Sequence, residues 1–450
     1  MKERRILKAI ISVGAVTILA KSFLVIRDLI IAKYFGIDAD IDAFFFASLV
    51  RMHIVNVLGG AIAIAFLPRL IKVRMRLSQA ELQRIYSSFC SSLALALVIV
   101  SLISVLAMHL YTTMASGISS KLVVLFFIMF PALITSALSN VQIAMLAAYE
   151  KYTTPALISS ISPIVSIFCL PLAPSMAKVY WLATSVSCGA ILECMLLQLI
   201  LKRNGLMVIR IQEFACRFRI PRRYKSILIG TAILTLVSII PQGIAGILGS
   251  GNIAILAYSQ KIASVVSAIA GTAIATVSHT YFSQLASQKA WRSLSYTLVR
   301  FVTFYSLALV MICIILIYLN DSLVNMLFVH GSFSEQNASK LRPVQIASII
   351  QIPFAALSIP LYRVLTTLNL SKPLWRIPLF GVLFMLIAIA PLTHTYGITG
   401  IALAITSYHI FSTTSYLFAI RRKLSLKDST SQPLGEVERD SNLETSLNLS

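Results

Sequence analysis

Long apolar runs separated by short polar segments follow one another along almost the whole chain. Most runs hold about 20 residues, which is the length that an α-helix needs to cross a bilayer. The runs are continuous and do not alternate with polar residues, so the pattern disfavours a membrane β-barrel. Twelve spans fit the pattern, at about residues 8–33, 43–67, 86–110, 122–148, 155–175, 179–201, 227–248, 253–285, 300–320, 344–366, 375–392 and 397–420.

The spans divide into two groups of six. MLAAYEKYTTPAL (145–157) and RVLTTLNLSKPLW (363–375) occupy corresponding places in the two groups, which indicates an internal repeat. We therefore expect an all-α polytopic membrane protein of about 12 transmembrane helices, in two six-helix lobes related by a pseudo-two-fold axis along the membrane normal. The expected division is an N-terminal lobe (1–201), a basic cytoplasmic linker (202–226), a C-terminal lobe (227–423) and a disordered cytoplasmic tail (424–450).

Composition agrees with a membrane protein and the distribution of charge orients it. The chain is 58% hydrophobic and only 12% charged, with a net charge of +22. Of its 38 Lys and Arg residues, 29 lie in segments expected on the cytoplasmic side and five in segments expected outside. This asymmetry follows the positive-inside rule, so the basic balance needs no nucleic-acid partner. We expect a multi-pass protein of the bacterial inner membrane with both termini cytoplasmic and the first span retained.

No motif in the sequence is typical of an enzyme or of a cofactor site. The six cysteines are scattered, and none has the spacing of a metal site or of a redox pair. No nucleotide-binding loop and no nucleophile–base pattern is present. We therefore predict no catalysis, no metal and no cofactor.

Charged residues inside the spans are the candidates for function, because a charge in hydrocarbon is costly and usually faces a wet cavity. Lys21 and Asp28 are seven residues apart and lie close to one helix face, with Arg27 about a third of a turn away. One alternative is that these cations only neutralise Asp28 inside the bundle. The sequence around Lys261 contains no Asp or Glu between Glu213 and Asp321. A carboxylate partner for Lys261 would therefore have to come from the first half of the chain. We expect Lys261 to face water or an anionic ligand.

The sign of the intramembrane charge distinguishes between classes of transporter. Arg51 lies in the first turns of the second span and is a fourth cation within the spans. The spans thus contain four cations and three carboxylates, namely Lys21, Arg27, Arg51 and Lys261, and Asp28, Asp42 and Glu193. A cationic cavity suits a pyrophosphate, which Arg can bind with two parallel hydrogen bonds and Lys as a point charge. An exporter of cationic drugs would be expected to show mainly carboxylates.

The stretch RDLIIAKYFGIDADIDAFFFA (27–47) resembles the opening of the MurJ/MviN lipid II flippase family, which reads R-D-x-x-x-A-x-x-F-G…D-A-F-F-x-A. Similar segments follow along the chain: AFLP (65–68), AYSQK (257–261), MLFVHGSFS (326–334) and IPLYRVLTTLNLSKP (359–373). The resemblance implies export of the lipid-linked peptidoglycan precursor by alternating access of two lobes. It also implies that Lys21, Arg27 and Lys261 bind the pyrophosphate, and it aligns Asp42 with a family Asp.

The sequence also departs from the family pattern. Val55-Asn56 stands where the family has paired arginines, and Arg51, one turn earlier, is the candidate replacement. The family has about fourteen spans, and only twelve fit this sequence. Some relatives bind sodium through carboxylates in the second half; spans seven to twelve contain none here, so we predict no such site.

The expected function is that of a monomeric lipid II flippase whose partners are an anionic lipid-linked substrate and membrane lipids. The candidate substrate-binding residues are Lys21, Arg27, Asp28, Asp42, Arg51 and Lys261. Two other transport functions stay open at this point, namely a flippase for another polyprenyl-linked oligosaccharide and a multidrug antiporter. A scaffold without transport activity is a fourth interpretation.

Overall fold

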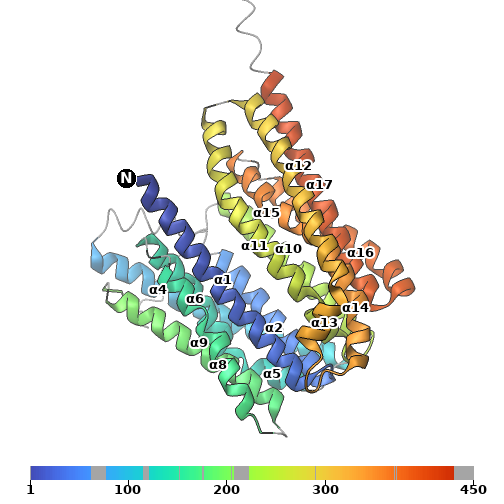
Figure 1. The fold of residues 1–450 in the computed structure, drawn as a ribbon. Coiled ribbons are helices and arrows are strands. Elements are labelled where there is room, and N and C mark those ends of the chain that lie inside the picture. The colour runs from blue at the N-terminus through green and yellow to red at the C-terminus, as the bar shows by residue number, and fades with distance from the viewer. Residues whose placement is uncertain are drawn as a thin grey trace, which may run out of the picture.

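The computed structural model of the chain is a bundle of long helices in two groups (Figure 1). The residues that it describes are 2–61, 78–114, 121–149, 151, 153–174, 177–203, 205–206, 222–288, 290–368, 370 and 372–429. No strand occurs among them. A helix satisfies its own backbone hydrogen bonds, which is the condition for crossing hydrocarbon, and the expected fold class is confirmed.

The first group is the N-terminal lobe. Its helices, in chain order, are α1 (Lys2–Phe35), α2 (Ala39–Ile54), the π-helix η1 (Val55–Ala61), α4 (Gln79–Met114), α5 (Leu122–Ile128), α6 (Phe130–Ala148), α7 (Thr153–Ile158), α8 (Ile161–Cys169), the short 3-10 turn η2 (Leu170–Leu172) and α9 (Lys178–Lys202).

The second group is the C-terminal lobe. Its helices are α10 (Arg222–Ile247), α11 (Asn252–Ser287), α12 (Trp291–Tyr318), α13 (Asn320–Phe328), α14 (Glu335–Ile350), α15 (Ile352–Thr367), α16 (Pro373–Tyr396) and α17 (Ile398–Ser429).

Ten segments of the described chain are long and apolar enough to cross a membrane. Together with the long helices α1 and α17, they lie where the twelve spans are expected, although several spans are broken into two helices. The last helix runs to Ser429 and so extends beyond the expected limit of the lobe at residue 423. Much of the expected linker and most of the expected tail lie outside the described residues.

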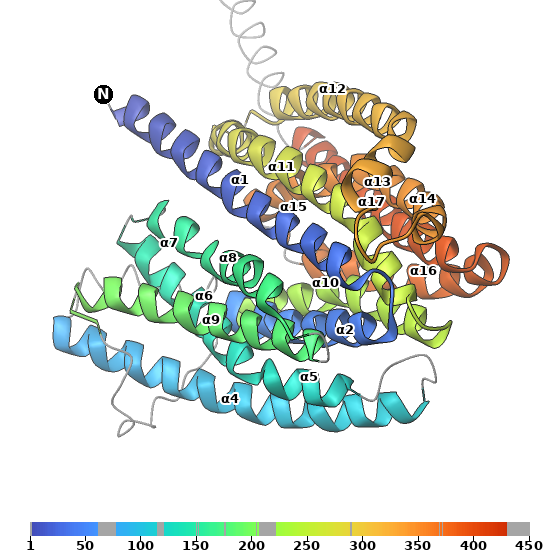
Figure 2. The ribbon, with the colours of Figure 1, turned by 60° about the horizontal axis from the view of Figure 1, so that its bottom comes forward.

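The two lobes share a hydrophobic core at one end only. The larger core cluster contains most of the buried hydrophobic residues of the N-terminal lobe and continues into the C-terminal lobe, through Ile253 and Tyr258 at the start of α11 and through parts of α10, α13, α14, α16 and α17. A second cluster begins further along α11 at Ala263 and stays within the C-terminal lobe. Figure 2 shows α1 between the α7–α8 pair and α11, which places it at the boundary between the lobes. The start of α11 therefore belongs to both lobes, whereas its later turns belong to one.

The second span departs from a regular helix where α2 gives way to η1. Gly59 in η1 lies so close to α6 that a Cβ atom on it would meet the Ala137 Cα at 2.8 Å. The next residue, Gly60, has room, because its nearest neighbour would be the Asn140 Nδ2 at 3.8 Å. Gly59 thus allows η1 and α6 to pack at backbone contact distance.

These neighbouring glycines form a matched pair for a stability test. We expect Gly59→Ala to lower the free energy of unfolding by about 1–3 kcal/mol, because overpacking forces the two helices apart. Gly60→Ala should be neutral or slightly stabilising, because Ala has the higher helix propensity. Thermal unfolding of the purified protein in detergent would measure both; equal melting temperatures for the two variants would contradict the close packing of η1 on α6.

Candidate functional site

A cavity of about 630 Å³ lies between the lobes. Residues of α1, α2 and α9 form its wall on the N-terminal side, and residues of α10, α11, α15 and α17 form the opposite wall. Three of the expected site residues line it: Arg27 from α1, Arg51 from α2 and Lys261 from α11. The fold therefore brings cations from three separate spans to one space.

Asp28 joins two of these cations behind the cavity surface. Its Oδ1 accepts hydrogen bonds from the Arg27 Nη2 at 2.6 Å and Nε at 3.0 Å, and its Oδ2 lies 2.6 Å from the Lys261 Nζ. The Asp28 side chain is only 3% exposed, while Arg27 and Lys261 are 17% and 28% exposed and reach the cavity. The carboxylate partner for Lys261 thus comes from the first half, and both cations are ion-paired and accessible at once.

Arg51 is the third cation and is nearly buried. Its Nη1 donates to the Ser136 Oγ at 3.3 Å, and its Nε has no hydrogen-bond partner among the described residues. It lies close enough to Arg27 and Glu193 to interact with both charges. Val55, at the position of a family arginine, is buried in the core instead of lining the cavity. Arg51 is therefore the cation that this part of the second span supplies.

The cavity is electropositive. No described Asp or Glu is among its lining residues, and the one carboxylate bonded to the lining cations is Asp28. The three lining cations and the carboxylate bonded to them sum to a charge of +2, because the Arg27–Asp28–Lys261 group contributes one positive charge and Arg51 the other. Glu193, which acts on Arg51 from outside the cavity lining, is not included in this sum. A buried charge needs a partner, so this surplus favours an anionic ligand.

The C-terminal lobe supplies a neutral, hydrogen-bonding wall that the sequence analysis did not identify. Gln242, Gln260, Gln351 and Tyr408 line the cavity there. The Gln242 Oε1 and the Tyr408 OH are buried without a hydrogen-bond partner in the described part of the chain. The sequence could have indicated this wall, because glutamines occur within the seventh, eighth and tenth spans. A polar amide in an apolar span usually lines a cavity or a helix contact.

Asp42 lies elsewhere, at the end where the lobes meet. Its Oδ2 accepts from the Gly251 N–H at 2.6 Å and its Oδ1 from the Ala254 N–H at 2.7 Å. An N-terminal-lobe carboxylate therefore caps the first turn of α11, a helix of the other lobe, where the helix dipole favours negative charge. Asp42 is fully buried and is not among the cavity-lining residues. This geometry assigns it a contact between lobes.

Further hydrogen bonds between the lobes gather at the same end. The Tyr258 OH donates to the Gly36 O at 3.3 Å, and the Ser332 N–H donates to the Lys33 O at 2.8 Å. The Tyr111 OH donates to the Gly243 O at 2.6 Å. We call this set of contacts, together with those of Asp42, the lobe seal. It joins the two lobes beyond Arg27, on the side where α2 and α11 begin.

Lys21 is exposed and does not line the cavity. It lies three residues before Leu24, which does line it, so the two side chains share a helix face. Lys21 is thus placed one turn nearer the N-terminus than the cavity wall. No group of three His, Cys, Asp or Glu side chains that could hold a metal was found among the described residues.

The fold is that of a two-lobed membrane transporter. A solved multidrug resistance MATE family transporter of the MOP superfamily, in its inward-facing conformation, superimposes with a TM-score of 0.71 over 94% of this chain and 99% of that one, at 10% identity. A lipid II flippase MurJ in an inward closed conformation gives a TM-score of 0.77 over 91% of this chain and 87% of that one, at 20% identity.

The sequence comparisons identify the family. The model of the family "Lipid II flippase MurJ" matches residues 31–432, so the chain belongs to that family. A curated relative, the probable lipid II flippase MurJ of Buchnera aphidicola subsp. Schizaphis graminum, is 27% identical over 348 residues. That alignment covers 73% of this chain and 66% of the relative, about two thirds of its length. The family resemblance found in the sequence is thereby confirmed.

The lobe seal can be tested by comparing Asp42 with Asp40. Asp42→Ala removes two hydrogen bonds to a carboxylate, each of which contributes about 1.5–3 kcal/mol, and should open the seal at least about tenfold more often. Asp40→Ala removes the same charge but breaks an ion pair to Lys121 that lies within one lobe. A cysteine at cavity residue Ser48 should therefore react faster with an impermeant maleimide, applied outside cells, in Asp42→Ala only.

Each variant without the Ser48→Cys change supplies the background labelling of the native cysteines. Equal labelling of the Asp42→Ala and Asp40→Ala cells would contradict the role of Asp42 in the seal.

Proposed function

We propose that the chain is a lipid II flippase that moves the undecaprenyl-pyrophosphate-linked peptidoglycan precursor from the inner to the outer leaflet. The observation that carries the proposal is the electropositive cavity between two lobes, with Arg27, Arg51 and Lys261 on its walls. Membership of the MurJ family supports the substrate class. The protein acts as a monomer of the inner membrane with both termini cytoplasmic, and it carries out no chemical step.

The cations suit a pyrophosphate in both charge and geometry. The two negative charges of a pyrophosphate diester balance the surplus of +2 on the cavity walls. Arg27 and Arg51 present planar guanidinium groups that can each donate two parallel hydrogen bonds, while Lys261 contributes a point charge. The polyprenyl tail stays in lipid. The Gln242 Oε1, the Gln351 Oε1 and the Tyr408 OH, which have no hydrogen-bond partner among the described residues, are available for the polar part of the head group.

The state of the structure corresponds to a carrier closed toward the outside. The lobe seal joins the starts of α2 and α11. The charge asymmetry of the loops supports an outer position for this end. Alternating access then requires the seal to break and the opposite ends of the lobes to approach each other.

Substrate binding and lobe movement are linked through Asp28. Lys261 and Asp28 belong to different lobes, so their ion pair is itself a contact between lobes. A pyrophosphate that binds Lys261 and Arg27 competes with Asp28 for both cations, and Lys21 adds a further cation toward the N-terminus on the same helix face. Arrival of the substrate thereby weakens an interlobe contact that holds the empty carrier.

The membrane potential acts mainly on the empty carrier under this proposal. Each charge that crosses the field contributes about 2.3 kcal/mol per 100 mV. The loaded cavity is neutral and moves with little electrical work, whereas the empty cavity, with its surplus of +2, is drawn back toward the negative interior. The potential therefore resets the transporter.

Complementation of a strain depleted of its own lipid II flippase tests the proposal. We expect wild type to rescue growth, and Arg27→Ala, Arg51→Ala and Lys261→Ala to fail at matched membrane levels. Removing one partner of a buried charge pair costs about 3–5 kcal/mol, so folding must be checked by thermal unfolding of each variant. Lys261→Arg keeps the charge and should rescue.

A matched control is Arg300→Ala, which removes a cation from α12 outside the cavity and should rescue fully. Failure of inserted wild type to rescue would favour another polyprenyl-linked oligosaccharide as substrate. Rescue by all three cavity variants would contradict the pyrophosphate-binding role. A cation exporter, by contrast, would lose activity on neutralisation of Asp28 or Glu193 and would be indifferent to Lys261.

A further inference from the structure

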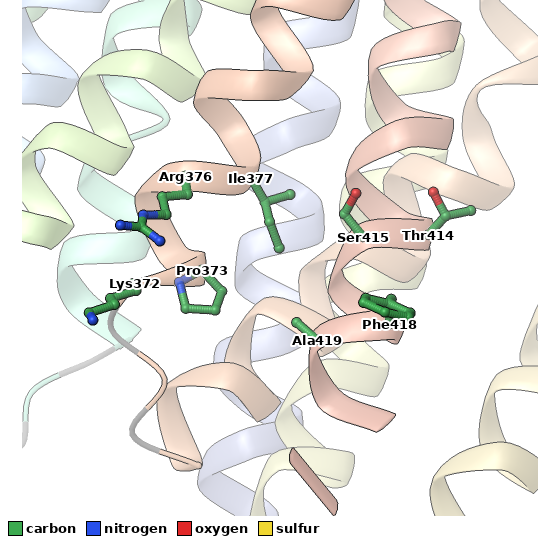
Figure 3. A pocket seen from close by; sticks show the side chains of 8 residues that line it. All are labelled: Lys372, Pro373, Arg376, Ile377, Thr414, Ser415, Phe418 and Ala419. Carbon is green, nitrogen blue, oxygen red and sulfur yellow. The ribbon is translucent and has the colours of Figure 1, made fainter. Parts of the chain in front are cut away.

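A second cavity lies on the C-terminal lobe, outside the space between the lobes. It has a volume of about 460 Å³ and is formed by the first turns of α16 and the late turns of α17. We call it the α16–α17 groove. Lys372 and Arg376 on α16 and the hydroxyl residues Thr414 and Ser415 on α17 line it, together with apolar residues (Figure 3).

The groove combines a cationic edge with an apolar floor. Figure 3 shows the nitrogen atoms of Lys372 and Arg376 together on one side of the first turn of α16, with Ile377 pointing down between the two helices. Phe418 is 68% exposed and contributes an apolar wall from α17. The cations thus border the groove, and its interior is apolar.

The two cations have no local counter-charge. Neither Lys372 nor Arg376 forms an ion pair with any residue that the structure describes. The sequence from residue 336 to residue 427 contains no Asp or Glu at all. Arg376 also lies over the ring of Trp375, 5.5 Å from its centroid, so its guanidinium is held near the helix surface. The two cations at the edge of the groove are therefore free to bind an anion.

The surface next to the groove is apolar. Along α16 beyond the groove, Phe380, Phe384 and Ile387 are exposed, with Ile387 75% exposed. A soluble anion would make no favourable contact with these apolar side chains, whereas an acyl chain would bury them. At the other end of the groove α17 continues to Arg421 and Arg422, which mark the basic, cytoplasmic edge of the lobe. Charge at the edge and apolar surface below it match an amphipathic anion of the inner leaflet.

We propose that the α16–α17 groove binds an anionic glycerophospholipid, with the phosphate at Lys372 and Arg376 and an acyl chain along Ile377 and the exposed face of α16. Basic pockets between transmembrane helices on the cytoplasmic side are suited to anionic head groups. The bound lipid anchors the C-terminal lobe to the inner leaflet. Its site shares no lining residue with the cavity between the lobes.

Trp375 provides a direct probe of the groove. The chain has three tryptophans, so Trp181→Phe with Trp291→Phe leaves Trp375 as the single fluorophore. The full-length variant is reconstituted in phosphatidylcholine vesicles that contain increasing amounts of brominated phosphatidylglycerol, and quenching of Trp375 fluorescence is measured. A second series uses brominated phosphatidylcholine, and the quenching at equal lipid content is compared between the two series. We expect phosphatidylglycerol to be preferred about tenfold, because each of two cations attracts an anionic lipid.

Lys372→Gln with Arg376→Gln should remove the preference. Arg421→Gln with Arg422→Gln removes the same charge from the same edge without touching the groove, and should leave the preference in place. Quenching by brominated phosphatidylcholine shows that each variant is folded and inserted. Equal quenching by both lipids in the parent protein, or equal loss in both double variants, would overturn the proposal.

One further outcome would also overturn it. The last 21 residues of the chain carry several acids, including Glu436, Glu438 and Asp440. If the phosphatidylglycerol preference emerges only when these three are changed to Gln or Asn, the occupant of the groove is this acidic segment and not a lipid.

Discussion

The placement of Asp28 is the interaction on which the site depends. A carboxylate in the membrane interior is tolerated only with partners, and Arg27 and Lys261 both bind it within 3.0 Å. Because Lys261 belongs to the other lobe, the same ion pair that neutralises Asp28 also sets α1 beside α11. The charge surplus of the cavity follows from this arrangement, since one carboxylate serves two cations and Arg51 has only a hydroxyl partner and the more distant Glu193.

Asp42 shows a different use of a carboxylate in the same bundle. Its side chain does not cap a helix of its own lobe. Instead it accepts two backbone hydrogen bonds from the first turn of α11. Asp28 and Asp42 thus hold the lobes together at two depths, one through side-chain cations and one through a helix terminus. A transporter of this fold must break such contacts in each cycle, so contacts made of a few strong polar interactions suit the task better than a continuous apolar interface.

The sequence predicted the fold well because hydrocarbon imposes a simple constraint: each span needs about 20 apolar residues in a helix. The breaks within spans were not predictable in the same way. Gly59 of the π-helix η1 packs against Ala137 of a distant helix, and a contact of this kind leaves no periodic signal. The extension of α17 to Ser429 had no apolar signal either.

The cost of a charge in hydrocarbon made it predictable that cations within the spans would face a cavity or a carboxylate, but not which lobe each side chain would meet. Binding of substrate by these residues stays a prediction. Charges inside spans had to face a cavity or each other, and Arg27, Arg51 and Lys261 do line one. The structure assigns Asp42 to the lobe seal and places Lys21 beyond the cavity wall, because spacing along a chain does not say which lobe a side chain meets. The glutamines of the neutral wall were visible in the sequence, but only the packing of α10, α11 and α15 brings them together.

The most direct test of the central claim is photo-crosslinking of the substrate inside the cavity. A photoreactive residue would replace Ser264, which lines the cavity one turn from Lys261, in cells that synthesise radiolabelled lipid II. The account predicts a lipid II adduct with the parent protein that disappears when Lys261 is changed to Ala. It predicts no adduct from Thr297 of α12, which does not line this cavity. An adduct that persists without Lys261, or no adduct at Ser264 at all, would contradict a pyrophosphate held by the cavity cations.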